Sequence, residues 1–419
     1  MKLVINTTTF PASDDDPVPR FVLDQIKEMH ALDPGLDIDV VVPHNAYGPK
    51  IPDRLDHSSH REFRYHYFFP RSAETLAGRG IMPALKENPL RYVLIPFFLL
   101  AQYRALLQHC KSQQPDLVYA HWFMTPAIVS YFVCKRLGIP LMFTSHASDV
   151  SVLAKVPFAK GLVARVLTYA SQFTAVSNRT ADKMKAFFSE SDWQARYSKK
   201  LSIIPMGTAL NTGLPTKEKQ QKLLTDCGID VEKRYILGMG RLSEKKGFQY
   251  LVEAYGRLDV RLREKIQLVI AGDGQLMEEL KLQAKEIGGE GKVIFTGYAS
   301  GELKNTLLGN ASLFVLPSIV DDSGDSEGLP VAMMEALANG KMIVATNVSG
   351  AEEVLTTESG ILVDQKSPEL LKDAITRLLT LPADQKAQME NAARKLGKQF
   401  DWRKIASDHL KLMKRATSQ

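Results

Sequence analysis

The sequence has few cysteines and lacks the short motifs of several common enzyme classes. Only three cysteines occur among its 419 residues, at Cys110, Cys134 and Cys227. Thiols this far apart form neither a disulfide framework nor a zinc site, and they fit a reducing compartment. A Gly-x-Ser-x-Gly elbow, a paired-cysteine cluster and a Walker-type loop are all missing from the sequence. Their absence removes the usual hydrolase, zinc and NTPase interpretations.

Dense charge and long apolar runs are also scarce. The net charge is only +6, and no block of lysine and arginine interleaved with aromatic residues is present, so a nucleic-acid partner is not expected. The most apolar segment, Tyr92–Tyr103, contains Pro96 and is too short to span a membrane. We interpret it as a buried helix of the first domain. The alternative is a surface helix that docks on an anionic membrane with the help of neighbouring cations such as Arg91 and Arg104.

Carboxylate-rich segments give little support for a metal site. Asp14-Asp15-Asp16 and Asp37-Ile38-Asp39 resemble the carboxylate pairs that hold magnesium. The first falls in a polar loop and the second leads into a strand, so we interpret both as solvated and expect no metal. The opening residues, MKLVINTTTFP, form a short apolar run broken by polar residues. This pattern predicts a first β-strand rather than a signal peptide.

What the sequence does contain is a repeated alternation of strands and helices, in a chain too long for one ordinary core. Apolar residues make up 45% and charged residues 24% of it, as in folded soluble proteins. Helical patterns cover residues 20–32, 90–109 and 402–415, and short apolar runs predict parallel strands at 3–6, 39–43, 117–120, 141–145, 173–176, 201–205, 235–239, 267–271, 293–296, 313–316 and 342–345. The polar, lysine-rich stretch Asn211–Leu223 marks a boundary between two α/β domains, which we place at 1–208 and 209–395, with a last segment at 396–419.

The stretch Asp321–Gly350 has the strongest chemical signal. Pro330 is expected in the first turn of a helix that Gly340 ends. Free N–H groups and the positive dipole end at such a helix start favour an anion. Glu327 precedes this start, and Glu335 follows in the second turn. Because carboxylates accept hydrogen bonds from hydroxyl groups, the combination points to a ligand with both phosphate and sugar, such as a nucleotide sugar.

Loops that follow predicted strands supply further candidates. Gly240 to Gly247 reads GRLSEKKG, and Arg241 and Lys246 there are placed to clamp a diphosphate. The alternatives are solvated surface charges and a dinucleotide fingerprint, but Ser243 stands where the latter needs its third glycine. Two more glycine turns follow predicted strands. One contains Gly272 and Gly274, and the other contains Gly297, which directly precedes Tyr298. They would let backbone approach a nucleotide, although tight turns need glycine without any ligand.

Histidines mark the first half. His146 and Asp149 follow the predicted strand at 141–145, and His121 follows the strand at 117–120. Side chains at the carboxyl ends of parallel strands can face a binding site, where imidazole can hydrogen-bond a sugar hydroxyl. The alternative is a loop histidine with Asp149 as a helix N-cap.

The motifs GRLSEKKG, AGDG, VIFTGY and EGLPVAMMEALANG together resemble those of retaining glycosyltransferases of family 4, which have the GT-B fold. The match covers essentially the whole second half. It extends more loosely through SHASD, VSN and IPMG in the first half. The resemblance implies an α/β protein with two Rossmann-like domains whose parallel sheets face a central cleft. The N-terminal domain would bind the acceptor, the C-terminal domain would bind the nucleotide sugar, and the C-terminal helix would cross back to pack on the N-terminal domain.

The same resemblance implies roles for individual residues. Glu327 would contact the transferred sugar and Glu335 the ribose hydroxyls. Arg241 and Lys246 would hold the diphosphate, and His146 would face the sugar from the other domain. The remaining donor-site candidates are Gly240, Gly272, Gly274, Tyr298, Gly328, Leu329 and Pro330, with His121 and Asp149 as acceptor-side or lining residues.

The resemblance implies a retaining hexosyltransferase that needs no metal and no cofactor beyond its UDP- or GDP-sugar donor. Its partner would be a glycan or lipid-linked acceptor of cell-surface polysaccharide or glycolipid biosynthesis, met in the cytoplasm or at the inner membrane face. The basic and aromatic segment Arg61–Arg71 would suit such an acceptor, although ordinary packing explains it equally well. The chain departs from the family after the first strand, where TTTFPASDDDPVPR replaces a glycine-rich loop. A nucleotide-sugar epimerase and a non-catalytic nucleotide-sugar-binding protein remain alternatives.

Overall fold

The computed structural model describes residues 1–13, 16, 18–47, 50–77, 80–146, 153, 159–208, 213–322, 324, 326–348 and 350–418. The chain forms two compact units. The first joins Met1–Pro205 to Trp402–Gln419, and the second is Met206–Asp401. The divisions predicted from the sequence fall after residues 208 and 395.

An eight-stranded sheet in the order β3-β4-β2-β1-β5-β6-β7-β8 forms the centre of the first unit. All neighbouring strands are parallel except β3 and β4, which form an antiparallel edge. The strands are β1 (Lys2–Asn6), β2 (Asp37–Pro43), β3 (Arg54–Asp56), β4 (Arg61–Tyr65), β5 (Leu117–His121), β6 (Leu141–Ser145), β7 (Gln172–Ala175) and β8 (Leu201–Ile203).

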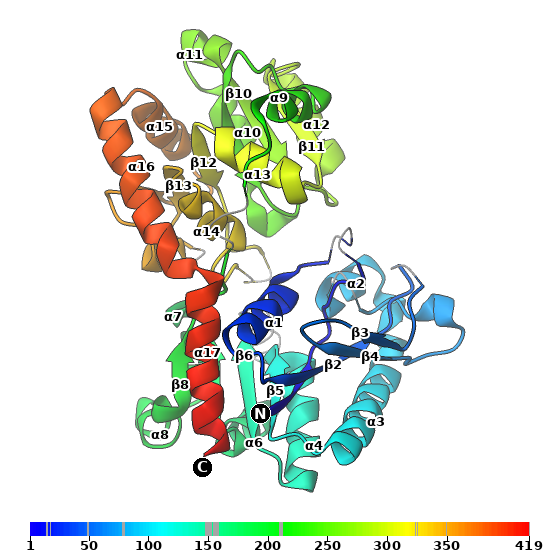
Figure 1. The fold of residues 1–419 in the computed structure, drawn as a ribbon. Coiled ribbons are helices and arrows are strands. Elements are labelled where there is room, and N and C mark those ends of the chain that lie inside the picture. Colours follow the sequence, from blue (N-terminus) through cyan, green and yellow to red (C-terminus); the bar gives the residue numbers. More distant parts are fainter. Residues whose placement is uncertain are drawn as a thin grey trace. The chain divides into compact units, whose positions relative to one another are not determined.

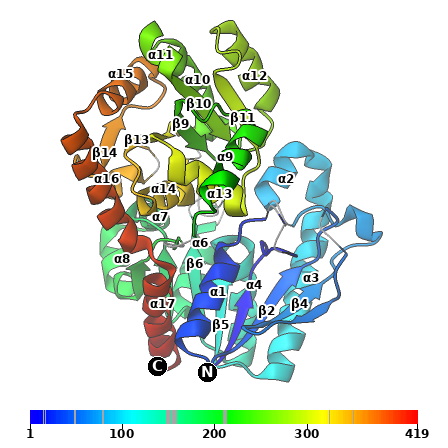
Figure 2. The same ribbon diagram turned by 45° about the horizontal axis from the view of Figure 1, so that its top comes forward.

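Helices pack around this sheet, and the final helix of the chain is one of them. Figures 1 and 2 show α17 (Trp402–Thr417) alongside α1 (Phe21–Leu32) in the first unit. The inner face of α17 is apolar and buried, with Ile405, Leu412 and Met413 among its residues. The other helices are α2 (Ile81–Glu87), η2 (Pro89–Leu94), α3 (Ile95–Gln113), α4 (Ile128–Leu137), α6 (Ala159–Tyr169), α7 (Asn178–Lys185) and α8 (Glu190–Arg196).

The second unit has a six-stranded, all-parallel sheet in the order β11-β10-β9-β12-β13-β14. Strands buried on both faces read as nearly continuous apolar runs, as in IQLVIA of β10, where every residue is buried. The strands are β9 (Arg234–Met239), β10 (Ile266–Ala271), β11 (Val293–Gly297), β12 (Leu313–Leu316), β13 (Ile343–Thr346) and β14 (Gly360–Val363). The helices are α9 (Lys217–Asp226), α10 (Phe248–Gly256), α11 (Val260–Lys265), α12 (Met277–Glu286), α13 (Gly301–Asn310), α14 (Val331–Ala338), α15 (Pro368–Leu379) and α16 (Ala383–Gly397).

Every strand predicted from the sequence is present, but β3, β4 and β14 were not predicted. Charges conceal β4, because Arg61 and Arg64 interrupt its apolar pattern. The Arg61 guanidinium donates to Asp39 and Asp37, both at 2.6 Å. The solvated interpretation is therefore wrong for Asp39, which is fully buried. Burial alone would raise the pKa of Asp39, but hydrogen bonds from His109 and Arg61 outweigh it and hold this pKa below its usual value.

The interpretation of Tyr92–Tyr103 as a buried helix is also wrong for its outer face. Along α3, the side chains of Phe98, Gln102, Leu106 and Cys110 are buried at the spacing of one helical face. The conclusion that the segment is too short to span a membrane is also wrong as far as length goes, because the helical stretch Pro89–Gln113 extends beyond it on both sides. By length and composition alone this stretch could cross a membrane, and 22% of its most apolar window is buried inside the protein. Apolar side chains on η2 and α3 remain exposed, namely Leu90, Tyr92, Val93, Phe97 and Leu100. We call these five residues the outer apolar face.

Removing one buried side chain of α17 should destabilise the first unit. Met413 is fully buried, so Met413→Ala should lower the free energy of unfolding by about 2–5 kcal/mol. All three tryptophans, Trp122, Trp193 and Trp402, belong to this unit, so tryptophan fluorescence in urea reports on it. Lys414→Ala removes a 63% exposed side chain and an ion pair with Asp33. It should change stability by less than about 1 kcal/mol, and equal losses in the two variants would contradict the packing of α17.

Candidate functional site

The candidate residues of the second unit gather at the carboxyl ends of its parallel strands. Backbone hydrogen bonds join the loops that follow β9, β10, β11 and β12 into one connected edge. These bonds run from the amides of Gly240, Leu242, Gly272 and Ile319 to the carbonyls of Ala271, Asp273, Gly297 and Lys245, at 2.8 to 3.0 Å. This edge is where parallel α/β sheets bind their ligands.

Glycines make the close contact between these loops possible. Gly272 has a φ of +157°, and a Cβ added there would lie 1.8 Å from the carbonyl oxygen of Gly240. At Gly274, with a φ of +159°, an added Cβ would lie 2.4 Å from the carbonyl oxygen of Leu242. Neither position tolerates a side chain. Contact between two loops therefore accounts for these glycines before any ligand is considered.

The segment from Glu327 to Pro330 leads into α14 at the same edge. Pro330 is the N-cap of this helix, with a φ of −70° and a ψ of +124°, so its predicted place in the first turn is wrong by one residue. Its extended ψ keeps it outside the helix, while its carbonyl accepts from Met333 N–H at 3.1 Å. The amides at this helix start carry the positive end of the dipole. An anion would be stabilised in front of Gly328–Pro330.

Lys246 and Glu327 form the central ion pair of this edge. Lys246 Nζ lies 2.7 Å from Glu327 Oε1 and 2.8 Å from Oε2. Each side chain is only 13% exposed, so each charge needs its partner. Ser318 Oγ, which is buried, lies 3.5 Å from Glu327 Oε2. The structure thus brings together the residue expected to hold the diphosphate and the residue expected to hold the sugar.

A second ion pair involves a residue that the sequence analysis missed. Glu335 Oε1 on α14 accepts from Lys304 Nζ of α13 at 2.6 Å. Lys304 lies on a helix that carries none of the motifs, so no sequence signal could have identified it. Arg241 and Tyr298 are exposed in the loops after β9 and β11. Their side chains are placed to meet solvent or a ligand.

In the first unit, two candidate histidines are direct neighbours. His121 Nδ1 lies 3.3 Å from His146 Nε2, because β5 and β6 pair and end at the same sheet edge. The rings of Trp122 and Phe21 lie 4.8 and 5.1 Å from the His146 ring. The third candidate on this side, Asp149, lies outside the described residues.

A third histidine, His409 of α17, belongs to the same group, in which His121 and His409 are fully buried and His146 is partly exposed. Its Nδ1 lies 2.9 Å from Ile405 O, and its ring lies 6.0 Å from the Tyr119 ring. Burial lowers the pKa of His409 to about 4 and the pKa of His146 to about 3, and it holds the pKa of His121 well below its usual value. All three imidazoles are therefore neutral near pH 7. His409 was missed because it lies far from the other two along the chain.

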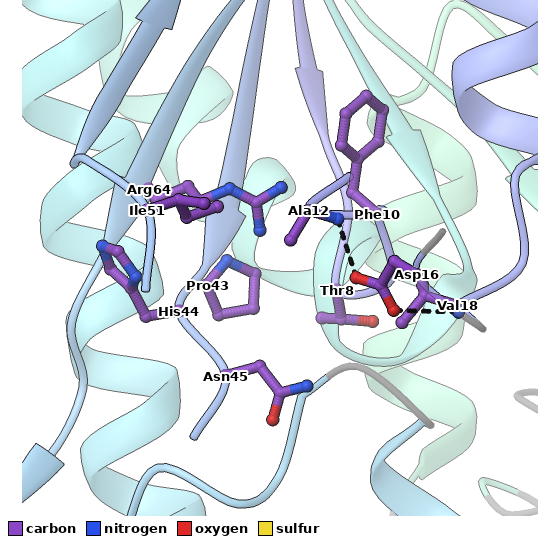
Figure 3. Close-up of a pocket in the computed structure, with 10 residues that line it drawn as sticks. All are labelled: Thr8, Phe10, Ala12, Asp16, Val18, Pro43, His44, Asn45, Ile51 and Arg64. Carbon is purple, nitrogen blue, oxygen red and sulfur yellow. Dashed lines mark hydrogen bonds between the residues drawn. The ribbon is translucent and has the colours of Figure 1, made fainter. Parts of the chain in front are cut away.

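A pocket opens at the carboxyl ends of β1 and β2 in the first unit (Figure 3). The Arg64 guanidinium reaches it from β4 and donates to Glu62 Oε2 and to Pro11 O at 2.8 and 2.9 Å. The pocket is lined by Thr8, Phe10, Ala12, Asp16, Val18, Pro43, His44, Asn45, Ile51 and Arg64. The Arg64 cation faces the carboxylates of both Glu62 and Asp16, so the charges are balanced and the lining suits a neutral polar group such as a hydroxyl.

The segment that replaces the glycine-rich loop forms one wall of this pocket. The carboxylate of Asp16 accepts from Ala12 N–H at 2.8 Å and from Val18 N–H at 3.1 Å (Figure 3). Asp16 therefore stabilises the loop through hydrogen bonds to its backbone, and the prediction that its carboxylate is only solvated is wrong. Asp14 and Asp15 lie outside the described residues.

Acid should destabilise the first unit through its buried histidines. An unfolded histidine has a pKa of about 6.5, whereas His409 titrates near 4 in the folded unit. Between these values the unfolded chain binds more protons than the folded chain does. The free energy of unfolding therefore decreases as the pH is lowered, by up to about 1.4 kcal/mol per pH unit for each such histidine. The urea midpoint from tryptophan fluorescence should fall between pH 6.5 and 4, and less steeply for His409→Leu. An unchanged slope in that variant would contradict the assignment.

Comparison with known proteins agrees with this architecture. Residues 18–208 match the family model described as "Glycosyltransferase Family 4", and residues 219–396 match "Glycosyl transferases group 1". The amylovoran biosynthesis glycosyltransferase AmsK of Erwinia amylovora is 32% identical over 404 residues, 92% of each chain. The putative teichuronic acid biosynthesis glycosyltransferase TuaC of Bacillus subtilis is 27% identical over 90% of this chain and 89% of its own.

A solved structure shows the same fold. HepE of Anabaena, in complex with UDP, superimposes with a TM-score of 0.68 over 98% of this chain and 99% of its own, at 16% identity. Two α/β units with parallel sheets, this similarity and the family matches lead to one conclusion. The chain belongs to the family 4 glycosyltransferases and has the GT-B fold.

Proposed function

We propose that this glycosyltransferase moves a hexose from a nucleotide-diphosphate sugar, with retention and without a metal ion, to a glycan or lipid-linked acceptor of a cell-surface polysaccharide. The Lys246–Glu327 ion pair, whose side chains are each 13% exposed, is the observation that carries this proposal. It places a cation for phosphate and a carboxylate for hydroxyl groups in contact at the start of α14. A nucleotide sugar presents these two groups side by side.

In the proposed donor complex Lys246 and Glu327 no longer bind each other, and each binds a different part of the donor. The diphosphate binds Lys246, with Arg241 and the α14 start adding positive charge. Glu327 is released to accept hydrogen bonds from the sugar, and Glu335 takes the ribose hydroxyls. Gly240, Gly272 and Gly274 keep the backbone close enough for this arrangement, and Leu329 and Tyr298 border it.

The proposed reaction breaks the bond between the anomeric carbon and the phosphate oxygen while the acceptor oxygen attacks the same face. The acceptor proton moves to the leaving phosphate oxygen, so the products are the glycoside and the nucleoside diphosphate. Negative charge grows on the phosphate during this step, where Lys246, Arg241 and the helix start stabilise it. These groups supply the positive charge for which other enzymes use a metal ion.

His146 has a restricted role in this proposal. Because burial lowers its pKa to about 3, it is neutral at physiological pH and cannot serve as the acid. Its imidazole can still hydrogen-bond a hydroxyl group of the sugar. We assign His146 to positioning the sugar, with His121 as its neighbour.

The names of the relatives support the proposed pathway and donor. AmsK and TuaC carry names from amylovoran and teichuronic acid biosynthesis, and HepE was solved with UDP. We therefore propose a UDP-sugar as the donor to test first, with GDP-sugars second. The pocket beside Arg64 and Asp16 in the first unit is the proposed place for a polar acceptor group.

Breaking the ion pair should abolish transfer and leave the fold intact. For Lys246→Met and Glu327→Gln we expect the rate to fall by roughly 10²-fold or more, the usual loss when a group that stabilises transition-state charge is removed. Product formation by mass spectrometry, with UDP- and GDP-sugars and a polyprenyl-linked acceptor, measures this loss. Circular dichroism checks folding, and Lys281→Met, which breaks an exposed ion pair with Glu278 on α12, is the control.

Three outcomes would contradict the proposal. A near-normal rate in either variant would overturn the site assignment. A converted sugar nucleotide formed without acceptor would indicate the epimerase alternative. Binding of a donor without turnover on any acceptor would indicate a binding protein.

We propose further that the outer apolar face docks on an anionic membrane surface at the cytoplasmic side. Leu90 is 80% exposed and Val93 is 66% exposed, which leaves a contiguous apolar stretch of η2 and α3 in water. The exposed Arg104 lies on the same helix, which favours anionic lipid. A lipid-linked acceptor would be met at such a surface.

The thiols Cys110, Cys134 and Cys227 are free, in keeping with a reducing compartment.

Polar substitutions on this face should weaken membrane binding. Leu90→Ser combined with Val93→Ser should lower partitioning onto phosphatidylglycerol vesicles by roughly 10-fold or more, because two apolar side chains no longer enter the lipid. Co-sedimentation measures the bound fraction. Val260→Ser combined with Leu282→Ser, at exposed positions of the second unit, is the matched control. Equal binding of both double variants would rule out this docking face.

A further inference from the structure

The hairpin between β3 and β4 places three metal-ligating side chains on one face. His57 and His60 flank the turn, and His57 N–H donates to His60 O at 2.9 Å. Residues opposite each other in an antiparallel pair share a face, as do residues two apart along a strand. His57, His60 and Glu62 therefore point to the same side, and their ligand atoms all lie within 4.8 Å of one another.

One of these ligand atoms lacks the partner that burial demands. The His60 side chain is 1% exposed, and its Nε2 makes no hydrogen bond within the part of the chain that the structure describes. Glu62 Oε1 lies 3.6 Å away from this nitrogen, whereas His57 Nε2 lies 2.8 Å from the same oxygen. A buried polar atom without a partner is costly. A cation between these atoms would satisfy all three.

Neighbouring groups already orient the ligands. His60 Nδ1 lies 3.0 Å from Ser59 Oγ, and when this nitrogen donates, Nε2 keeps a lone pair for a metal. Glu62 uses its other oxygen, Oε2, to accept from the Arg64 guanidinium at 2.8 Å, which leaves Oε1 facing the histidines. Such second contacts are typical of metal sites.

We propose that His57 Nε2, His60 Nε2 and Glu62 Oε1 bind one divalent transition-metal ion of the Zn²⁺ class, with water as the fourth ligand. Two imidazoles and one carboxylate suit this class. Tetrahedral Zn²⁺ with bonds of about 2.0–2.1 Å separates its ligand atoms by roughly 3.3 Å. The two separations to Glu62 Oε1, 2.8 and 3.6 Å, bracket that value. The His57 and His60 rings are stacked, with centroids 4.5 Å apart and an angle of 16° between their planes, so metal binding requires the rings to rotate until both Nε2 lone pairs point at the ion.

A second cluster in the first unit is less suited to a metal. His44, Asp53 and His66 also lie close together, but their ring nitrogens have partners. His44 Nε2 lies 2.8 Å from Asp53 Oδ1, and His66 Nδ1 lies 2.7 Å from Glu74 Oε2. His57 has a similar contact in the first cluster, so the difference lies elsewhere: the Asp53 side chain is 74% exposed, and no ring nitrogen of His44 or His66 is a buried atom without a hydrogen bond in the described part of the chain.

The ligands of the proposed metal contact two residues that line the pocket of Figure 3. Glu62 holds Arg64, which lines that pocket, and the ring of Phe10, another lining residue, lies 5.6 Å from the His60 ring. The metal would fix both contacts and tie the edge strand β3 to β4. Its role is structural and does not depend on the proposed transfer reaction.

Metal titration tests the site directly. Full-length protein is stripped with EDTA, and Zn²⁺ is added in competition with a chromophoric chelator. We expect one equivalent to bind, and His57→Gln to weaken binding at least 10-fold, because the substitution removes one ligand at a side chain that is 41% exposed. Glu62→Gln should do the same. Tryptophan fluorescence in urea verifies that each variant is folded.

Control measurements separate this site from other ligands. His66→Gln, from the second cluster, should bind Zn²⁺ like the unmodified protein. Co²⁺ should give visible bands of nitrogen and oxygen ligation without thiolate charge transfer, which excludes the three cysteines. Absence of stoichiometric binding, equal affinity in His57→Gln, or loss of binding only in His66→Gln would overturn the proposal.

Discussion

Close approach of backbone to backbone at the carboxyl edge of the second sheet is the constraint on which the rest of the proposed donor site depends. A Cβ at Gly272 would lie 1.8 Å from a carbonyl oxygen, and one at Gly247 would lie 2.0 Å from another. Because no side chain intervenes, loops from separate strands bond to one another. Lys246 can then reach Glu327, a residue 81 positions away in sequence. A larger residue at either glycine would separate the charges before it touched any ligand.

The ion pair explains how two charges with little access to water can be stable when no ligand is bound. Lys246 and Glu327 satisfy each other while each is only 13% exposed, so neither is left as an unpaired buried charge. A donor with one anionic and one hydroxyl-rich portion offers each of them a new partner at once. A bare phosphate would satisfy Lys246 and leave Glu327 without a partner. In the proposed donor complex the same contact would favour sugar nucleotides over simple phosphates.

The sequence predicted the parts of the fold and site that local patterns encode. Each strand predicted from an apolar run is present in the structure. The motif around Glu327 predicted the start of α14 to within one residue, because Pro330 is the N-cap and not part of the first turn. What the patterns could not encode depends on distant partners. β4 was hidden because the charge of Arg61 is neutralised by Asp39, and Lys304 and His409 join their groups only through packing. The outer face of α3 was misjudged because apolar composition does not tell which side of a helix has a partner.

The route of the chain gives the two units an unusual order of completion. The second unit ends at Asp401. The first unit is complete only with α17, which follows Asp401 in the sequence. During synthesis the second unit can therefore finish folding before the first, although it starts in the middle of the chain. Until α17 emerges, the surface of α1 and β5 that it covers is open to water. That surface is where a nascent chain would be most exposed to aggregation or to capture by a chaperone.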